Sequence, residues 1–427
     1  MRNTKQHRIS FFGYGLTTRA IARKLGGGCT FYDDNCTTAY TDAQDNTILP
    51  SADFDPDRSD LEILTPSILP HHPLLKKAKN PVSEYDFFLA ASAFDASLAT
   101  MHDPHGTKTP KPFTIWISGT NGKTTTTQML THLLAKRGAV YGGNIGVPLA
   151  DMDPTAPIWV LESSSYTLHH TRHASPDIYL LLPITPDHLD WHGTPEQYEA
   201  DKLRPLLTMR EGELALVPKG LKLPPTNAWV VEYDSNDFLE RFFDLDSRKL
   251  RYKAAFLQDA LLALAVTRTL FEEADYTLLN RFRLDHHRQE EIKDSLNRLW
   301  VNDSKATNVD AAIQAINTYH DRPIRLILGG DDKGVDLNPL MDLIATESIT
   351  LYTIGSNSDK LAQMAQKRAI PCHNCETLDR AVSEIDRHLR TEEVALLSPA
   401  ASSLDQFPSY AKRGALFMEM VENLRNS

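Results

Sequence analysis

The chain has 427 residues, which is enough for about three domains of ordinary size. Its formal net charge of −11 argues against a nucleic-acid-binding protein, because contacts to phosphates require a basic surface. Only four cysteines are present, and the polar N-terminus leads directly into a strand pattern, so the sequence predicts a cytoplasmic protein without disulfides or a membrane segment.

The first predicted unit is a strand, a glycine turn and a helix. Residues 9–12 are apolar and are followed by Gly13 and Gly15 and then by helical spacing. Residues 29–34 predict a second strand that ends in acid, with Asp33 where a Rossmann-like unit meets a ribose. The third glycine of the dinucleotide motif is missing, so a dehydrogenase and a nucleotide-sugar site both remain open.

A polar stretch follows this first unit. Residues 101–112 contain three prolines and no apolar periodicity, which is typical of a linker between domains. We therefore expect a first domain over residues 1–110.

The strongest motif in the chain joins an apolar strand to a helix. Residues 113–117 predict a buried parallel strand, and glycines at 119 and 122 allow a tight loop whose N–H groups point at an anion. Lys123 adds a positive charge for the phosphates, and Thr124 is placed to bind Mg²⁺. The loop has two residues between its glycines, where the common P-loop has four, but the strand-loop-helix context indicates a nucleotide site.

Two more predicted strands of this central domain end in polar residues. Glu162 follows the apolar residues 158–161, where a carboxylate beside a P-loop is placed to hold Mg²⁺. Asp187 and His188 follow residues 178–182, and their pattern fits a metal site and a polar turn equally well. The glycine-rich residues 142–146 suit either close approach to a ligand or an ordinary loop.

A third domain is predicted from residue 284 to the end of the chain. Apolar strand patterns alternate with helical spacing, which indicates a second doubly wound α/β sheet with polar motifs at the strand ends. Cys372 and Cys375 have the CxxC spacing of a metal or redox site, but no second pair lies near them, which favours plain surface thiols.

The loop over residues 119–125, Gly-Thr-Asn-Gly-Lys-Thr-Thr, resembles that of the Mur ligases and folylpolyglutamate synthetases, which use ATP to form an amide bond on a carboxylate. Within the Mur ligases, the motifs at residues 302–308, 329–333 and 397–407 resemble those of the branch that adds D-glutamate. The resemblance implies an α/β protein of three domains. These are a Rossmann-like UDP-binding domain (1–110), a central P-loop ATPase-type parallel-sheet domain (111–283) and a C-terminal Rossmann-like domain for the amino acid (284–427).

The resemblance also implies roles for individual residues. The catalytic residues are then Lys123, Glu162, His188 and Lys202. The ATP contacts are Gly119, Thr120, Asn121, Gly122, Lys123, Thr124, Thr125, Arg288, Asp303 and Lys305. Two Mg²⁺ ions are held by Thr124, Glu162, His188 and a carbamate on Lys202. The UDP-sugar contacts are Gly15, Leu16, Thr17, Asp33, Asn144 and Ser164, and the D-glutamate contacts are Thr307, Lys333, Ser403 and Tyr410.

The implied substrates are ATP, UDP-N-acetylmuramoyl-L-alanine and D-glutamate, bound by a monomer without nucleic-acid or membrane partners. This chain departs from the family pattern at Thr167, Pro183 and Trp191, and it lacks the two adenine-site asparagines expected near residues 255–259. Three other functions remain open. The first is another Mur-type ligase. The second is a folylpolyglutamate-type ligase, although its P-loop would lie close to the N-terminus, and the third is an ATP-binding regulatory protein with a decayed site.

Overall fold

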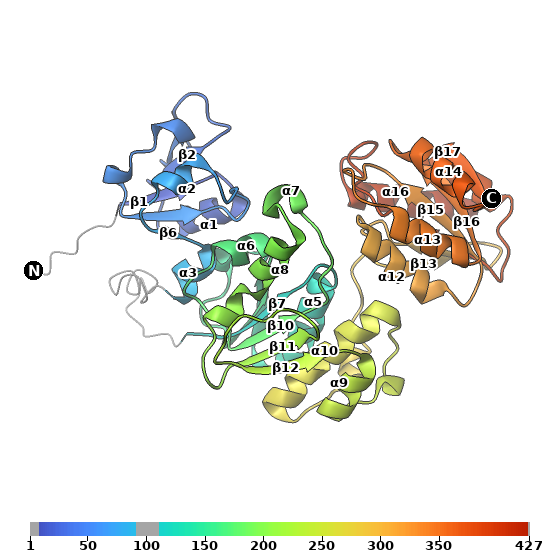
Figure 1. Ribbon diagram of the computed structural model, residues 1–427, viewed down its shortest axis with the longest axis horizontal. Helices are drawn as coiled ribbons and strands as arrows, with labels where there is room; N and C mark the ends of the chain where they lie inside the picture. Colours follow the sequence, from blue (N-terminus) through green and yellow to red (C-terminus); the bar gives the residue numbers. More distant parts are fainter. Residues whose placement is uncertain (1–7, 91–110, 426–427) are drawn as a thin grey trace, which may run out of the picture. The chain divides into compact units, whose positions relative to one another are not determined.

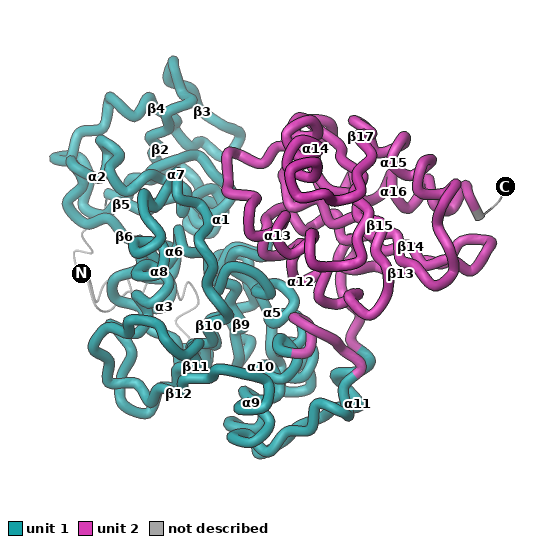
Figure 2. The backbone as a smooth tube through the Cα atoms, turned by 45° about the vertical axis from the view of Figure 1, so that its right-hand side comes forward, with its two compact units in different colours: residues 1–250, 258–281 teal, residues 251–257, 282–427 magenta. Residues whose placement is uncertain are grey.

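The computed structural model describes residues 8–90 and 111–425, so most of the predicted linker at 101–112 lies outside the described residues. The chain forms two compact units (Figure 2). The first comprises Met1–Leu250 and Gln258–Arg281, and the second comprises Arg251–Leu257 and Phe282–Ser427. The predicted domain boundaries at 110/111 and 283/284 stay predictions.

The first unit contains two six-stranded sheets, of which the N-terminal one is parallel except at its β3 edge. Its strand order is β3 (Tyr40–Thr41), β4 (Thr47–Pro50), β2 (Thr30–Asp33), β1 (Ile9–Phe12), β5 (Leu61–Leu64) and β6 (Pro81–Val82). The accompanying helices are α1 (Leu16–Lys24), α2 (Pro73–Lys77) and α3 (Glu84–Leu89). The short strands form because their apolar residues are buried on a sheet that is covered by helices.

The second sheet of this unit is parallel throughout. Its strand order is β12 (Trp229–Tyr233), β11 (Leu214–Pro218), β10 (Ile178–Leu181), β7 (Phe113–Ser118), β9 (Ile158–Glu162) and β8 (Ala139–Gly143). Its helices are α5 (Lys123–Leu134), α6 (Ser165–His170), α7 (Leu189–His192), α8 (Pro195–Leu203), α9 (Asn236–Phe243), α10 (Ala254–Phe271) and α11 (Tyr276–Leu279). The strand that precedes the P-loop, β7, is therefore central, with the ends of β9 and β10 on either side of it.

The second unit is built on one six-stranded sheet that is parallel except at its β13 edge. Its strand order is β13 (Glu290–Lys293), β14 (Leu299–Asn302), β18 (Val394–Leu397), β15 (Ile324–Gly329), β16 (Ile349–Ile354) and β17 (Cys372–Glu376). Its helices are α12 (Val309–Tyr319), α13 (Asn338–Thr346), α14 (Ser358–Lys367), α15 (Leu378–Asp386) and α16 (Tyr410–Arg425). Single 3-10 turns of the first unit lie at Ser51–Asp53, Pro56–Arg58, Ala135–Arg137, Leu149–Asp151, Arg204–Leu207 and Ser247–Lys249.

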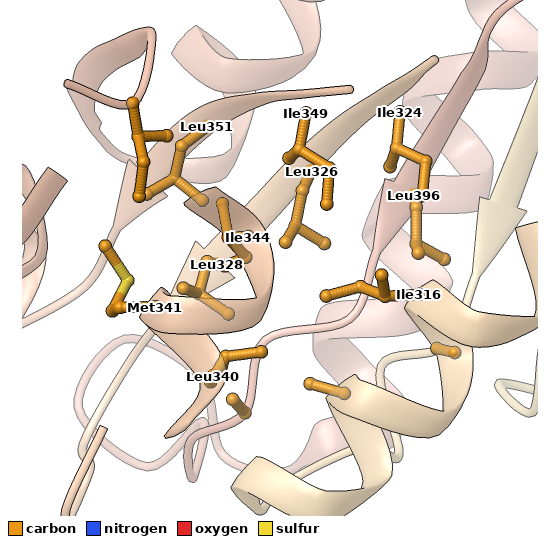
Figure 3. Packing of buried hydrophobic residues seen from close by; sticks show 14 of the residues in the cluster. Ile316, Ile324, Leu326, Leu328, Leu340, Met341, Ile344, Ile349, Leu351 and Leu396 are labelled. Carbon is orange, nitrogen blue, oxygen red and sulfur yellow. The ribbon is translucent and has the colours of Figure 1, made fainter. Parts of the chain in front are cut away.

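Both faces of this last sheet are covered. Leu326 and Leu328 of β15 point to one face, where they pack with Ile316 and Ile344 of the covering helices (Figure 3). Ile327 points to the other face and belongs to a separate cluster with residues of α15 and α16. Period-two alternation of apolar residues on two covered faces is the arrangement of a doubly wound α/β sheet, which confirms the predicted fold class.

The two nearby cysteines lie on β17 and face opposite sides of the sheet. Cys372 packs against one core cluster and Cys375 lies within the other. Residues i and i+3 on a strand point away from each other, so CxxC spacing brings no pair of thiols together here. The prediction of surface thiols is wrong for Cys375, which is buried, and burial raises the pKa of its thiol to about 11.

One helix also departs from expectation. Among the described helices, α10 is long and apolar enough to cross a membrane by length and composition. Its residues 259–267 are all buried within the first unit. A buried core helix has the same composition, so this helix does not by itself indicate a membrane protein.

We expect Leu326→Ala to lower the free energy of unfolding of the second unit by ~2–5 kcal/mol, because it leaves a cavity in a packed core. Hydrogen exchange of amides in this unit measures the change locally in the full chain. The matched control is Leu296→Ala at a side chain that is 63% exposed, where we expect a change within ~0.5 kcal/mol. Equal effects of the two substitutions would contradict the burial of β15.

Candidate active site

The P-loop lies between the C-terminal end of β7 and the start of α5. Gly119 has a φ of 140° and Gly122 a φ of 82°, and Gly122 is the N-cap of α5. Thr120 fixes the loop to the segment after β10: its N–H donates to Pro183 O (3.1 Å), and its hydroxyl donates to Thr185 O (2.8 Å). The backbone therefore presents a helix N-terminus to an anion, as the sequence predicts.

Both glycines are required by close packing as well as by backbone conformation. A Cβ atom at Gly119 would lie 2.5 Å from Leu182 Cβ, and one at Gly122 would lie 2.5 Å from Asp259 Oδ1. The Asp259 carboxyl group thus contacts the P-loop in the segment that lacks the family's adenine-site asparagines.

Two lysines lie against the same stretch of P-loop backbone. Lys123 donates from Nζ to Gly119 O (3.1 Å) and Thr120 O (2.7 Å). Lys202, on α8, is 1% exposed and donates from Nζ to Gly119 O at 2.8 Å, with Tyr198 providing a ring face at 4.7 Å. Burial, and then the charge of Lys123, hold the pKa of Lys202 well below its usual value, which favours a neutral amine.

Glu162 ends β9, in register with Ile117 of β7. The side chain is 3% exposed, and its Oε1 accepts from Asn144 Nδ2 at 2.7 Å. Its Oε2 is buried and has no hydrogen-bond partner in the structure. A buried carboxylate oxygen is costly unless a partner reaches it, and a cation in the site would be such a partner.

His188 is the N-cap of α7 and has a φ of 53°. Burial lowers the pKa of its imidazole; Asp187, 3.6 Å away, raises it, and the charge of Lys123 lowers it. The net result favours the neutral ring, which is the form that binds a metal. These electrostatic interactions show that the structure brings Lys123, His188 and Lys202 together. The carboxylate of Glu162 also acts electrostatically on Lys202 and raises its pKa.

The residues predicted to bind the UDP-sugar fall into two groups. Gly15, Leu16, Thr17 and Asp33 lie at the C-terminal ends of β1 and β2; Asp33 accepts from Tyr14 N at 2.6 Å, and Leu16 is 56% exposed. Asn144 directly follows β8, and Ser164 follows β9 as the N-cap of α6. The indole of Trp191 donates to Ser67 O (3.0 Å), which ties the loop after β5 to α7.

The residues predicted for the third domain lie at adjacent strand ends of the second unit. Asp303, after β14, is buried and accepts from Ser398 Oγ, after β18, at 2.9 Å, and burial raises the pKa of Asp303 to about 7. Lys305 Nζ lies over the Tyr410 ring at 5.4 Å. Ser403 is buried, whereas Thr307 and Lys333 are exposed, and Arg288 acts electrostatically on Asp303.

Sequence reasoning missed two buried groups. Asp201, beside Lys202, accepts hydrogen bonds from His169 and His192, which outweigh its burial and lower its pKa to about 2. Arg413 is 1% exposed and bonds to Ser304 and Ala401. In neither case are the partners neighbours in sequence, so no local motif marks them.

No group of three or more His, Cys, Asp or Glu side chains arranged to hold a metal ion occurs in the described ranges 8–90 and 111–425. A Mg²⁺ ion often takes one or two protein carboxylates and completes its shell with phosphates and water. The Oε2 atom of Glu162, which has no hydrogen-bond partner, and the ring of His188 fit a site with so few protein ligands.

Two family models match the chain. The model of the Mur ligase middle domain matches residues 117–229, and that of the Mur ligase, glutamate ligase domain matches residues 287–401. Among curated relatives, the UDP-N-acetylmuramoylalanine–D-glutamate ligase of Campylobacter jejuni subsp. jejuni serotype O:23/36 (strain 81-176) is 49% identical over 420 residues, covering 98% of this chain and all of the relative. The enzyme of the same name from Helicobacter pylori (strain ATCC 700392 / 26695) is 43% identical over 433 residues, covering 97% and 99%.

Solved structures are similar in fold. The MurF ligase from Thermotoga maritima in complex with ADP has a TM-score of 0.59 at 15% identity and covers 98% of each chain. E. coli FolC in complex with DHPP and ADP has a TM-score of 0.50 at 15% identity, covering 74% of this chain and 90% of that one.

We expect Gly119→Ala to reduce binding of a fluorescent ADP analogue by ~10-fold or more, because the added methyl group would displace Leu182 and the loop that is predicted to hold the phosphates. Titration of the full chain measures this. Gly212→Ala is the matched control, since Gly212 has a similarly unfavourable φ of 87° but no atom within 4 Å of the place that the added methyl group would take. Unchanged nucleotide affinity in Gly119→Ala would contradict the assignment of this loop.

Proposed function

This chain belongs to the Mur ligase family, and we propose that it is an ADP-forming ligase that adds D-glutamate to UDP-N-acetylmuramoyl-L-alanine in peptidoglycan precursor synthesis. Full-length identity of 49% to a relative named for this reaction is the observation that carries the proposal. A folylpolyglutamate-type ligase is less well supported, because FolC covers 74% of the chain, whereas the curated relatives cover 97–98%.

The reaction has two chemical steps. A carboxylate oxygen of the UDP-linked alanine attacks the γ-phosphorus of ATP, and ADP leaves. The amine of D-glutamate then attacks the acyl carbon, the phosphate leaves with the bonding electrons, and the nitrogen loses a proton. The carboxylate and the γ-phosphate repel each other, so the first step needs positive charge held in a fixed geometry.

The P-loop supplies that charge in this proposal. Lys123 and the N–H groups around Gly122 would hold the β- and γ-phosphates, and Asn121, Thr124 and Thr125 complete the loop. Arg288, Asp303 and Lys305 would contact the nucleotide from the second unit, with Asp303 on the ribose. The hydrogen bonds from Lys123 to two backbone carbonyls hold its ammonium group in one position against the loop, which supports this role.

The residues present fit two Mg²⁺ ions. Thr124 and Glu162 would hold one ion, and His188 with a carbamate on Lys202 would hold the other; when bound, the ions neutralise the charge that develops on the phosphates. The buried oxygen of Glu162 that lacks a partner supports the first site. The buried amine of Lys202, whose pKa is lowered by burial, supports carbamylation, because only an uncharged amine adds CO₂.

Substrate recognition would be divided among the three proposed domains. Residues 1–110 would bind the UDP group through Gly15, Leu16, Thr17 and Asp33, with Asn144 and Ser164 of residues 111–283 reaching the sugar end. Residues 284–427 would bind D-glutamate through Thr307, Lys333, Ser403 and the Tyr410 segment. We propose a cytoplasmic monomer without nucleic-acid or membrane partners, and the net charge of −11 argues against contacts to nucleic-acid phosphates.

Phosphate release from ATP tests this function directly. We expect sustained release only when both UDP-N-acetylmuramoyl-L-alanine and D-glutamate are present, and a ~100-fold or larger loss in Lys123→Ala because its charge acts on the transition state. Lys136→Ala is the control, since Lys136 is exposed just beyond the same helix. Release without D-glutamate dependence would contradict the acceptor, and a Lys123→Ala enzyme within about tenfold of the original would contradict the P-loop role.

Lys202→Ala should be nearly inactive and should regain part of its rate with added acetate or formate, because a small carboxylate would supply the oxygen ligand that the carbamate provides. Carbon-13 NMR after equilibration with ¹³CO₂ should show a carbamate signal in the original protein and none in the variant. Normal activity in Lys202→Ala, or a carbamate signal that survives the substitution, would exclude this role.

Lys333→Ala should raise the KM for D-glutamate by ~10-fold while that for ATP changes less than about twofold, because the lysine would pair with a carboxylate of the acceptor. Steady-state kinetics with each substrate varied in turn measure the two constants. Lys360→Ala serves as a control, since its amine pairs with Asp332 at 2.8 Å in the same region. Equal increases in both KM values would assign Lys333 to the nucleotide or to the fold.

A further inference from the structure

A buried hydrogen-bonded chain connects three helices of the first unit. Asp201 on α8 accepts from His192 Nδ1 at 2.7 Å and from His169 Nδ1 at 2.8 Å. His192 Nε2 lies 3.0 Å from the hydroxyl of Ser165, the first residue of α6. Among the helices that carry these residues, α8 packs against both α6 and α7 (Figure 1).

Three residues of this hydrogen-bond network, Ser165, His192 and Asp201, lie near residues that we propose to hold Mg²⁺. Ser165 follows Glu162 by three residues, His192 follows His188 by four, and Asp201 directly precedes Lys202. These three segments are separate in the sequence: the first follows β9, the second follows β10, and the third is part of α8. The side chain of His192 is the point at which all three meet.

His192 is also coupled to the backbone of His188. The carbonyl oxygen of His188 accepts from His192 N at 3.0 Å, and His188 has the left-handed φ of 53°. A non-glycine residue keeps this conformation only when its surroundings fix it. The hydrogen bonds of the His192 ring therefore anchor α7, the short helix that begins directly after His188.

The order Ser165, His192, Asp201 is also the order of a hydrolase triad, but the burial excludes that role. The side chains of His192 and Asp201 have no exposed surface, and Ser165 is 3% exposed. The Tyr166 ring stacks on His192 at 5.6 Å, and the rings of Trp191 and Tyr198 pack on it at 4.5 and 5.1 Å. A substrate carbonyl has no access to the serine, so the chain of hydrogen bonds can act only on its protein neighbours.

We propose that His192, held by Asp201 and Ser165, is a positioning residue that fixes Glu162, His188 and Lys202 relative to one another. This inference rests on the proposed metal-dependent function of those three residues, and it adds the group that orients them. Residues that orient metal ligands from behind commonly change metal affinity by ~10–100-fold when they are replaced.

The test measures metal binding and carbamylation, not only turnover. Electron paramagnetic resonance follows Mn²⁺ binding to the full chain with ADP, and the ¹³C carbamate signal reports on Lys202. For His192→Phe, which removes both hydrogen bonds, we expect ~10-fold weaker Mn²⁺ binding and a reduced carbamate signal. His192→Asn retains a donor toward Asp201 and should bind Mn²⁺ within about threefold of the original protein.

His169→Phe is the matched control. It removes a hydrogen bond to the same carboxylate, but His169 lies at the far end of α6 from Glu162. We expect Mn²⁺ affinity and the carbamate signal to change less than about threefold, on the same scale of effects. If His169→Phe and His192→Phe weaken Mn²⁺ binding equally, the network is a part of the core without a special role, and the proposal is wrong.

Ser165→Ala decides the question if His192→Phe does not fold, because it removes one neutral hydrogen bond and leaves Asp201 paired. Mn²⁺ binding that is several-fold weaker supports the proposal, and binding equal to that of the original protein overturns it. An original protein that binds Mn²⁺ and carries the carbamate but does not use D-glutamate would refute the acceptor alone. An original protein without either signal would refute the metal site and this inference with it.

Discussion

The placement of Lys202 beneath the P-loop is the constraint on which the central site depends. Its amine bonds to Gly119 O at 2.8 Å, and the same carbonyl oxygen accepts from Lys123 at 3.1 Å. Two ammonium groups this close would repel each other strongly in a site without solvent. The lysine on α8 is wholly buried, and its pKa is lowered, so the loop can carry the positive charge on Lys123 alone until a ligand arrives.

The parallel sheets explain why residues far apart in sequence reach this point. The strands β9, β7 and β10 are neighbours with the same direction, so the segments after Glu162, Ser118 and Leu181 leave the sheet at one edge. The second unit repeats the arrangement with β14, β18 and β15. Ligand sites of open α/β sheets lie at such edges because loops from several strands meet there.

The sequence predicts features that are formed by consecutive residues, and it does not predict contacts between residues that are distant in the chain. The loop from Gly119 to Lys123 is local, so its strand, turn and helix are predictable directly, and the three α/β sheets follow from similar patterns. The surface exposure predicted for Cys375 is wrong because the burial of a strand residue depends on what covers that face of the sheet, which the CxxC spacing does not show. The hydrogen bond between His169 and Asp201 joins residues 32 positions apart, and no pattern in a single sequence marks it.

Each unit also places a buried basic side chain under its strand-end loops, and the choice of side chain decides the charge there. In the second unit the guanidinium of Arg413 bonds to the hydroxyl and carbonyl oxygens of Ser304 and to Ala401 O, and burial lowers its pKa to about 10. A guanidinium with this pKa stays charged near neutral pH, whereas burial holds the pKa of Lys202 well below its usual value and so favours the loss of its proton. The second unit therefore keeps a fixed positive charge, which suits an anionic amino acid. In the first unit the buried lysine favours the neutral amine that the proposed reaction with CO₂ requires, and Lys123 is left as the charge proposed to face the phosphates.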